Sequence, residues 1–248
     1  MTLEARRMAE SRLGRFGMIA MVAIVTILAV SGSAFVIAGA NPIEAYQAYF
    51  ITPLTREFTL LEVLNKATPI LFTGTAVAIA FRAGYWNIGV EGQLLMGAVA
   101  AAGIGQIVDG WSPIVVLPLM VGAGALAGAL WALVPALLRV KMGIDEVVTT
   151  LLLNPVALLI VQGLLHGPWK DPETGFPESP RIAEAAEFPQ LSEFIPLIGR
   201  SRLHLGFVIA VVLIIVAWYV LSRTSTGLRV RAVGLSPRGA RFAGIKVE

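Results

Sequence analysis

Five polar or aromatic residues stand where their chemistry is unusual, because the chain around them is largely apolar. Asn87, Glu91 and Gln93 follow Trp86 in a glycine-rich stretch, and Asn154 lies in the middle of another apolar run. A carboxylate that enters a membrane segment is energetically costly and is a functional-site hypothesis by default. An interrupted helix lined by amide side chains suits an uncharged polar solute, and the Trp86 indole offers a face for stacking on a ring. These five residues are therefore the candidate substrate pathway.

Each of these residues also has a structural interpretation. Glu91 stands at the head of an apolar run, where a carboxylate stabilises the positive end of its own helix. Asn154 is followed by Pro155, which removes a backbone donor and favours a kink, so the Asn154 amide either lines a pathway or bonds a neighbouring helix. Four glycines in the first stretch allow a break, a tight turn or close helix contact: Gly84, Gly89, Gly92 and Gly97.

The inventory of residues excludes several other chemistries. The chain has no cysteine and only two histidines, His166 and His204, so it offers neither a disulfide framework nor a histidine-rich metal centre. It contains no P-loop sequence and no serine-hydrolase or zinc-peptidase motif. If the protein uses ATP, another chain must bind and hydrolyse it. A formal net charge of +3 is too small to indicate a nucleic-acid partner.

The composition indicates that lipid surrounds much of the chain. Of its 248 residues, 56% are hydrophobic and 14% are charged, whereas soluble domains carry about a quarter charged residues. Gly124 and Gly128 form a G-x-x-x-G face, which predicts close helix packing. Barrel strands would be about half as long as the apolar runs seen here and would alternate in polarity. Six runs are long enough to cross a bilayer as helices: 17–39, 59–81, 89–108, 112–138, 147–166 and 203–222.

The basic residues predict the orientation of this bundle. With a cytoplasmic N-terminus, the inner segments 1–16, 82–88, 139–146 and 223–248 hold 13 of the 19 lysines and arginines. This positive-inside pattern predicts six spans with both ends in the cytoplasm. Arginines before the first run and Ala38-Gly39-Ala40 after it also fit a cleaved signal peptide. The run is longer than the ~7–15 apolar residues of signal peptides, which favours an uncleaved anchor.

Two polar segments remain outside the runs. The proline-rich, acidic loop 167–202 is predicted to be periplasmic, either as a docking rim for a partner or as a plain connector. The tail 223–248 is basic. Within it, Ser236 and Pro237 are an N-cap and first-turn signal for a short helix over 236–245. Such a helix lies on anionic headgroups or docks a cytoplasmic partner.

Four ordered motifs resemble those of the ABC importer permeases of the simple-sugar and nucleoside branch. Residues 81–93, F-R-A-G-Y-W-N-I-G-V-E-G-Q, are similar to the R-A-G-x-x-N-I-G-x-E-G-Q signature of that family. Residues 143–154, G-I-D-E-V-V-T-T-L-L-L-N, resemble its next motif, G-x-x-E-V-x-T-T-x-x-x-N. The stretch 167–180 resembles the family's outer loop, and the motifs within 223–245 resemble its cytoplasmic loop that contacts the ATPase.

The resemblance implies an all-α polytopic transmembrane helix bundle that acts as the permease subunit for a nucleoside or simple sugar in the bacterial inner membrane. ATP would be bound by separate ATPase subunits, so this chain would need no cofactor and would be no enzyme. A second permease subunit, a periplasmic or lipid-anchored substrate-binding protein and membrane lipid would be its other partners. The implied ATPase-coupling residues are Arg231, Gly234, Ser236, Arg238, Ala240, Ala243 and Gly244.

The chain departs from the family pattern in two places, and other functions fit some of the same features. Pro155 stands where the resemblance implies another residue, and family members continue with further spans past the A-G-I sequence at 243–245, so the chain looks like a C-terminally truncated permease. An ion- or proton-coupled secondary transporter also uses interrupted helices and polar groups at the midplane. A membrane protein with only a structural or assembly role needs no pathway. The branched-chain amino acid permeases, which are more distantly similar, are the third choice for substrate.

Overall fold

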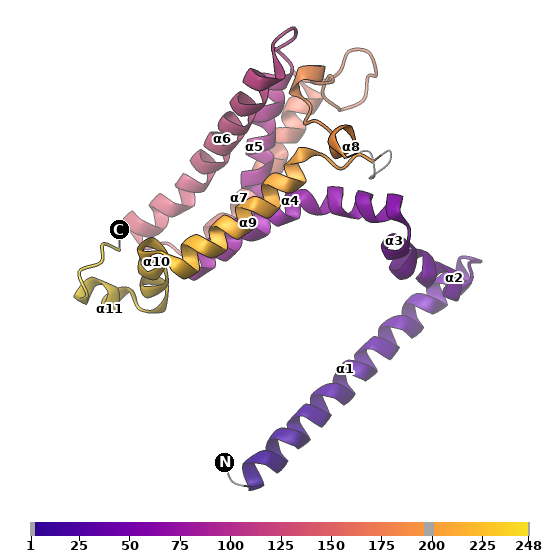
Figure 1. Cartoon of the computed structure of the whole chain (residues 1–248), viewed down its shortest axis with the longest axis vertical. Coiled ribbons are helices and arrows are strands. Elements are labelled where there is room, and N and C mark those ends of the chain that lie inside the picture. Colours follow the sequence, from indigo (N-terminus) through magenta and orange to yellow (C-terminus); the bar gives the residue numbers. More distant parts are fainter. Residues whose placement is uncertain (1–2, 196–200, 248) are drawn as a thin grey trace. The chain divides into compact units, whose positions relative to one another are not determined.

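The structure of the protein is a computed structural model that describes residues 3–195 and 201–247 (Figure 1). Within these ranges the regular elements are helices, apart from one isolated β-bridge between Gln190 and His204. The all-α fold is thus confirmed, and the chain is a multi-pass membrane protein. Among the described residues, five helices are long and apolar enough to cross a membrane: α1 (Leu3–Ile37, from Phe16), α4 (Glu57–Arg82), α6 (Pro113–Met142), α7 (Glu146–His166) and α9 (Leu205–Arg223).

The expected span 89–108 folds as a shorter helix, α5 (Val90–Gly105). Its 16 residues rise about 24 Å at 1.5 Å per residue, less than the ~30 Å thickness of a hydrocarbon core. The helix starts one residue later than expected, after the irregular connection 83–89, and ends three residues earlier, where the carbonyl oxygen of Gly105 accepts from the amide of Ala183 in the loop 167–202. The six-span topology stays a prediction.

The chain divides into two compact units, Met1–Val63 and Leu64–Glu248. In the first unit, α1 is followed by two short helices, α2 (Pro42–Tyr46) and α3 (Thr52–Thr55), with a π-helix (η1, Gln47–Ile51) between them. Tyr46 holds α2 against α1, because its hydroxyl donates to the carbonyl oxygen of Leu28 at 2.6 Å. The Tyr46 ring also lies edge-on to Phe35, with the ring centroids 5.6 Å apart.

In the second unit, α5 packs against both α6 and α7. Glycines permit the closest approach: a Cβ atom on Gly97 would lie 2.9 Å from the carbonyl oxygen of Gly124. One turn further along α6, a Cβ atom on Gly128 would lie 3.1 Å from the carbonyl oxygen of Gln93. The close packing predicted for the G-x-x-x-G face is confirmed, and its partner is α5.

The loop 167–202 is folded back onto the ends of α5 and α6, with residues 196–200 of this segment lying outside the described residues. It contains a 3₁₀ turn (η2, Glu184–Ala186) and a one-turn helix, α8 (Leu191–Phe194). The amide of Ala183 donates to the carbonyl oxygen of Gly105 at 2.8 Å. Ala186 is buried with Val108 and Val116, the latter in the first turns of α6. The loop is thus ordered by packing, while its role as docking rim or connector stays open.

The tail 223–248 forms two helices (its last residue, Glu248, lies outside the described part of the chain). The first, α10 (Ser225–Leu235), was not expected from the sequence. The second, α11 (Pro237–Phe242), begins as predicted, because the Ser236 hydroxyl accepts from the amide of Gly239 at 3.1 Å. It ends at Phe242 rather than at 245, since Gly244 adopts the left-handed region at φ 77°.

Candidate functional site

The motif residues meet at the irregular segment 83–89 between α4 and α5, which we call the helix break. The buried Asn87 side chain closes its end: Asn87 Oδ1 accepts from the amide of Gly89 at 3.0 Å, one residue before α5. Asn87 and Gln93 also exchange two amide hydrogen bonds, Nδ2 to Oε1 at 3.0 Å and Nε2 to Oδ1 at 3.1 Å. These bonds tie the break to the first turn of α5 and stop α4 from continuing as one helix.

Side chains on one face of α7 form hydrogen bonds to the helix break and to the start of α5. Glu146, Thr150 and Asn154 follow one another at intervals of four residues, so their side chains share a face. The Thr150 hydroxyl accepts from the amide of Ile88 at 3.1 Å. Asn154 Oδ1 accepts from the amide of Gly92 at 2.9 Å, and its Nδ2 donates to the carbonyl oxygen of Ile88 at 3.0 Å. We call these three residues the α7 clamp.

Glu146 of this clamp is a buried residue with an ionisable side chain. Its Oε2 lies 3.1 Å from Nε of Arg139 at the end of α6, the one ion pair among the described residues. Its Oε1 accepts from the amide of Trp86 at 3.4 Å. Nearby, burial raises the pKa of the Tyr85 hydroxyl, the Glu146 carboxylate raises it further, and Arg139 opposes the shift. Tyr85 therefore stays neutral at physiological pH.

The structure thus sorts the five pathway candidates into two groups. The side chains of Asn87, Gln93 and Asn154 are engaged in internal hydrogen bonds at the helix break and the start of α5. Trp86 is 55% exposed and packs on Phe81, with ring centroids 4.7 Å apart. Glu91 is exposed in the first turn of α5 and, within the described residues, makes no hydrogen bond or ion pair. The exposed pair is available to a solute, and the role of all five in a pathway stays a prediction.

Gly234 of α10 is the coupling candidate that reaches the helix break. A Cβ atom at Gly234 would collide with the carbonyl oxygen of Arg82 and would lie 3.0 Å from the amide nitrogen of Gly84. Conversely, a Cβ atom at Gly84 would lie 3.1 Å from the α-carbon of Gly234. The tail therefore packs on the break backbone to backbone.

The other coupling candidates lie around this contact and beyond it. Arg231 Nε donates to the carbonyl oxygen of Gly227 within α10, at 3.4 Å. Ser236 caps α11, and Ala240 is only 3% exposed, so this chain already buries it. Arg238, Ala243 and Gly244 are exposed.

Sequence reasoning did not assign Glu146, Thr150 or Arg139 to the site, although Glu146 and Thr150 stand in a quoted motif. Their four-residue spacing with Asn154 was the available signal, because it places all three on one helix face. Trp131 was also missed: its Nε1 is buried without a partner among the described residues and lies beside Gly92. No three His, Asp or Glu side chains gather as metal ligands in the part of the chain that the structure describes.

Comparison with known proteins agrees with the motifs. Residues 59–248 match the family described as branched-chain amino acid transport system / permease component. The glucose ABC transporter permease protein TsgB13 of Haloferax volcanii is 39% identical over 223 residues, covering 88% of this chain and 58% of that protein. The guanosine ABC transporter permease protein NupP of Bacillus subtilis is 32% identical, covering 89% of this chain and 62% of that protein.

A nucleoside ABC transporter permease protein of Lactococcus lactis, NupB, is 28% identical and covers 88% of this chain and 60% of its own length. The chain therefore spans less than two thirds of the length of these relatives. No solved structure matches it.

Proposed function

The chain belongs to the family of branched-chain amino acid transport system permease components, and from that premise we propose that it is the membrane-spanning permease subunit of an ATP-driven importer. The family match covers the helix break, the α7 clamp and the tail. The names of the similar permeases favour a nucleoside or a simple sugar as the transported solute. An ion-coupled secondary transporter gains no support from these relatives.

The observation that carries this proposal is the contact between the tail and the helix break. An importer driven by a separate ATPase needs a cytoplasmic surface that is mechanically connected to the membrane helices. Gly234 packs directly on residues 82–84. The Asn87–Gln93 bonds join the same break to α5, and the α7 clamp joins it to α7. A displacement of α10 would therefore reach three helices without passing through a flexible linker.

The surface that meets the ATPase is proposed to be α11 and the end of α10. Phe242 is 98% exposed and Leu235 is 88% exposed, while Arg238 adds a positive charge between them in sequence. Large exposed apolar side chains on a polar segment are typical anchors of protein interfaces. Ala240 is buried by this chain, so a bulky residue there would disturb α11 itself; Phe242 is the sharper probe.

The proposed setting is the bacterial inner membrane, with the N-terminus and the tail in the cytoplasm. A second permease subunit, ATPase subunits that bind the ATP and a periplasmic or lipid-anchored binding protein complete the assembly, the last facing the loop 167–202. Single cysteines test this orientation in the cysteine-free chain. A cysteine at Glu178 should react with an impermeant maleimide on intact cells, and one at Ser236 only after permeabilisation.

Transport itself is tested with the complete assembly in proteoliposomes. Uptake of radiolabelled guanosine or glucose should require the binding protein, and ATP on the ATPase side. Phe242→Ala should reduce co-purification of the ATPase, whereas Gln106→Ala, far along the chain in the α5–α6 turn, should not. Uptake driven by a proton gradient without ATP would instead establish the secondary transporter.

A further inference from the structure

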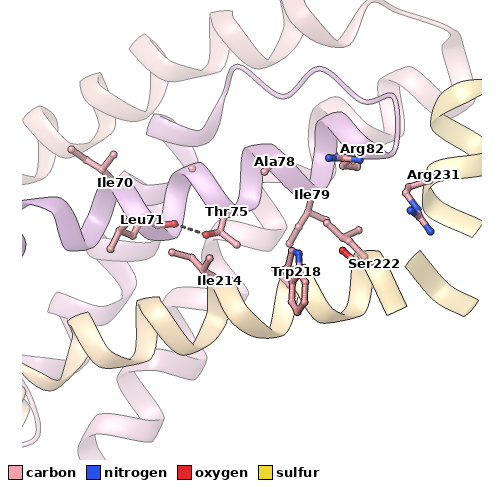
Figure 2. A pocket seen from close by; sticks show the side chains of 13 residues that line it. Ile70, Leu71, Thr75, Ala78, Ile79, Arg82, Ile214, Trp218, Ser222 and Arg231 are labelled. Carbon is pink, nitrogen blue, oxygen red and sulfur yellow. Dashed lines mark hydrogen bonds between the residues drawn. The ribbon is translucent and has the colours of Figure 1, made fainter. Parts of the chain in front are cut away.

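A groove of about 380 Å³ runs between α4 and α9 in the second unit and reaches α10 at one end (Figure 2). No pathway candidate lines it. Its volume falls within the range of small-molecule sites, which is about 300–1,000 Å³. The groove is therefore large enough to bind a small molecule other than the transported solute.

Most of the groove is apolar and accessible from the outside of the helix pair. Ile70, Ile79 and Ile214 line its length (Figure 2). The Thr75 hydroxyl donates to the carbonyl oxygen of Leu71 at 2.6 Å and so is not available to a ligand as a donor. Gly74 adds free space, because a Cβ atom there would meet nothing within 4 Å. Apolar cavities do not hold water well, so the lining of this groove suits a hydrocarbon chain better than water.

One end of the groove is positively charged. Arg82 in the last turn of α4 and Arg231 of α10 lie there, near Ser222 and Trp218 at the end of α9 (Figure 2). Neither arginine has an acidic partner among the described residues, where the one ion pair joins Arg139 to Glu146. Arg231 uses its Nε for the carbonyl oxygen of Gly227. Two guanidinium groups that line one end of a groove without an acidic partner are suited to a phosphate, which accepts several charge-assisted hydrogen bonds.

We propose that this groove binds one anionic glycerophospholipid, with an acyl chain along α4 and α9 and the phosphate against Arg82 and Arg231. In the orientation proposed above, Arg82 at the end of α4 and Arg231 within α10 lie on the cytoplasmic side, where anionic lipids attract arginines. A sugar would leave its hydroxyl groups facing isoleucines. An apolar helix of a second subunit would bury both arginines without a counter-charge, which costs several kcal/mol per ion. A lipid matches both parts of the groove, because its acyl chain covers the apolar length and its phosphate neutralises the arginines.

The test is native mass spectrometry of the purified full-length chain in mild detergent, titrated with phosphatidylglycerol or with phosphatidylcholine. One phosphatidylglycerol should be retained in preference to phosphatidylcholine. Arg82→Gln and Arg231→Gln should each weaken retention about fivefold. Gly74→Trp fills the groove and keeps both charges, so it should abolish lipid retention. Arg238→Gln, an exposed arginine outside the groove, is the matched control.

Monodisperse elution and an unchanged thermal midpoint in lipid-free detergent show that each variant is folded. Equal retention of the two lipids, or retention that survives Gly74→Trp, would overturn the proposal. So would efficient cross-linking of a cysteine at Gly74 to a second permease subunit in native membranes, because a protein helix would then occupy the groove.

Discussion

Gly84 and Gly234 meet backbone to backbone, although the described residues between them include the five α-helices α5, α6, α7, α8 and α9. Gly84 needs its left-handed backbone to end α4, and Gly234 needs its missing side chain to let α10 approach. The two requirements are different, and both are met by glycine. The signature that contains Gly84 and the tail that contains Gly234 thus form one packed unit.

The first prediction concerns this contact. Gly234→Ala should destabilise the protein by about 1–3 kcal/mol, because the added methyl group meets the carbonyl oxygen of Arg82 and the backbone cannot yield freely. Its measure is the thermal midpoint in detergent, together with the ratio of solute transported to ATP hydrolysed. Gly122→Ala in α6 is the matched control, since its Cβ atom meets nothing within 4 Å. An unchanged ratio in Gly234→Ala would show that the contact does not transmit motion.

The second prediction tests the α7 clamp through two adjacent threonines. Thr150→Val keeps the shape of a fully buried side chain but leaves the amide of Ile88 without its acceptor. An unsatisfied buried donor costs about 1–3 kcal/mol. Thr149→Val should be close to neutral, because the Thr149 hydroxyl bonds only to carbonyl oxygens of its own helix. Chemical unfolding of the two variants in parallel measures the difference, and equal losses would contradict the clamp.

Much of this architecture could be predicted from the sequence. Apolar runs located the long helices, and the pair Ser236–Pro237 located the start of α11, because capping chemistry is local. The helix break was visible in its glycines and amides. What the sequence could not show was which partners the amides would choose. Asn154 bonds Gly92 and Ile88, more than sixty residues away in the chain, and only the tertiary fold sets such a pairing.

The same limit explains α10, which the sequence did not predict. Its residues are mixed in polarity and carry Gly227 and Gly234, so neither periodicity nor helix propensity favours a helix there. Tertiary packing overrides this preference: a Cβ atom at Gly227 would collide with the carbonyl oxygen of Val220 in α9, and Gly234 meets the helix break in the same manner. The glycines that weaken the helix are those that let it pack.

A third prediction is a pH dependence at the start of α9. His204 Nδ1 accepts from the amide of Gly206 at 3.1 Å, which requires the neutral imidazole, and burial lowers the His204 pKa below its ordinary value of 6.5. The cap is therefore fully present above pH 6.5 and is lost as the pH falls below that value, since the unfolded chain takes up the proton first. His204→Asn should keep the cap and remove its pH dependence. Thermal midpoints at pH 5.5 and 8 should converge in that variant but differ in the natural chain.

His204→Ala should lose the cap at both pH values, at a cost of about 0.5–2 kcal/mol. If the natural chain and His204→Asn respond equally to acid, another group carries the dependence.

The last prediction separates structure from transport at the Asn87–Gln93 pair. Each amide bonds the other, so a double-mutant cycle of Asn87→Ala and Gln93→Ala should give a positive coupling energy, about 0.6 kcal/mol if it resembles other hydrogen bonds in membranes. Asn87→Ala should be the more harmful single change, because it also removes the acceptor for the amide of Gly89. Both variants should insert into the membrane and show lower ATP-coupled uptake. Normal uptake by both, in a complete assembly, would mean that this pair only shapes the break and that the solute passes elsewhere, with the exposed Trp86 and Glu91 the next residues to vary.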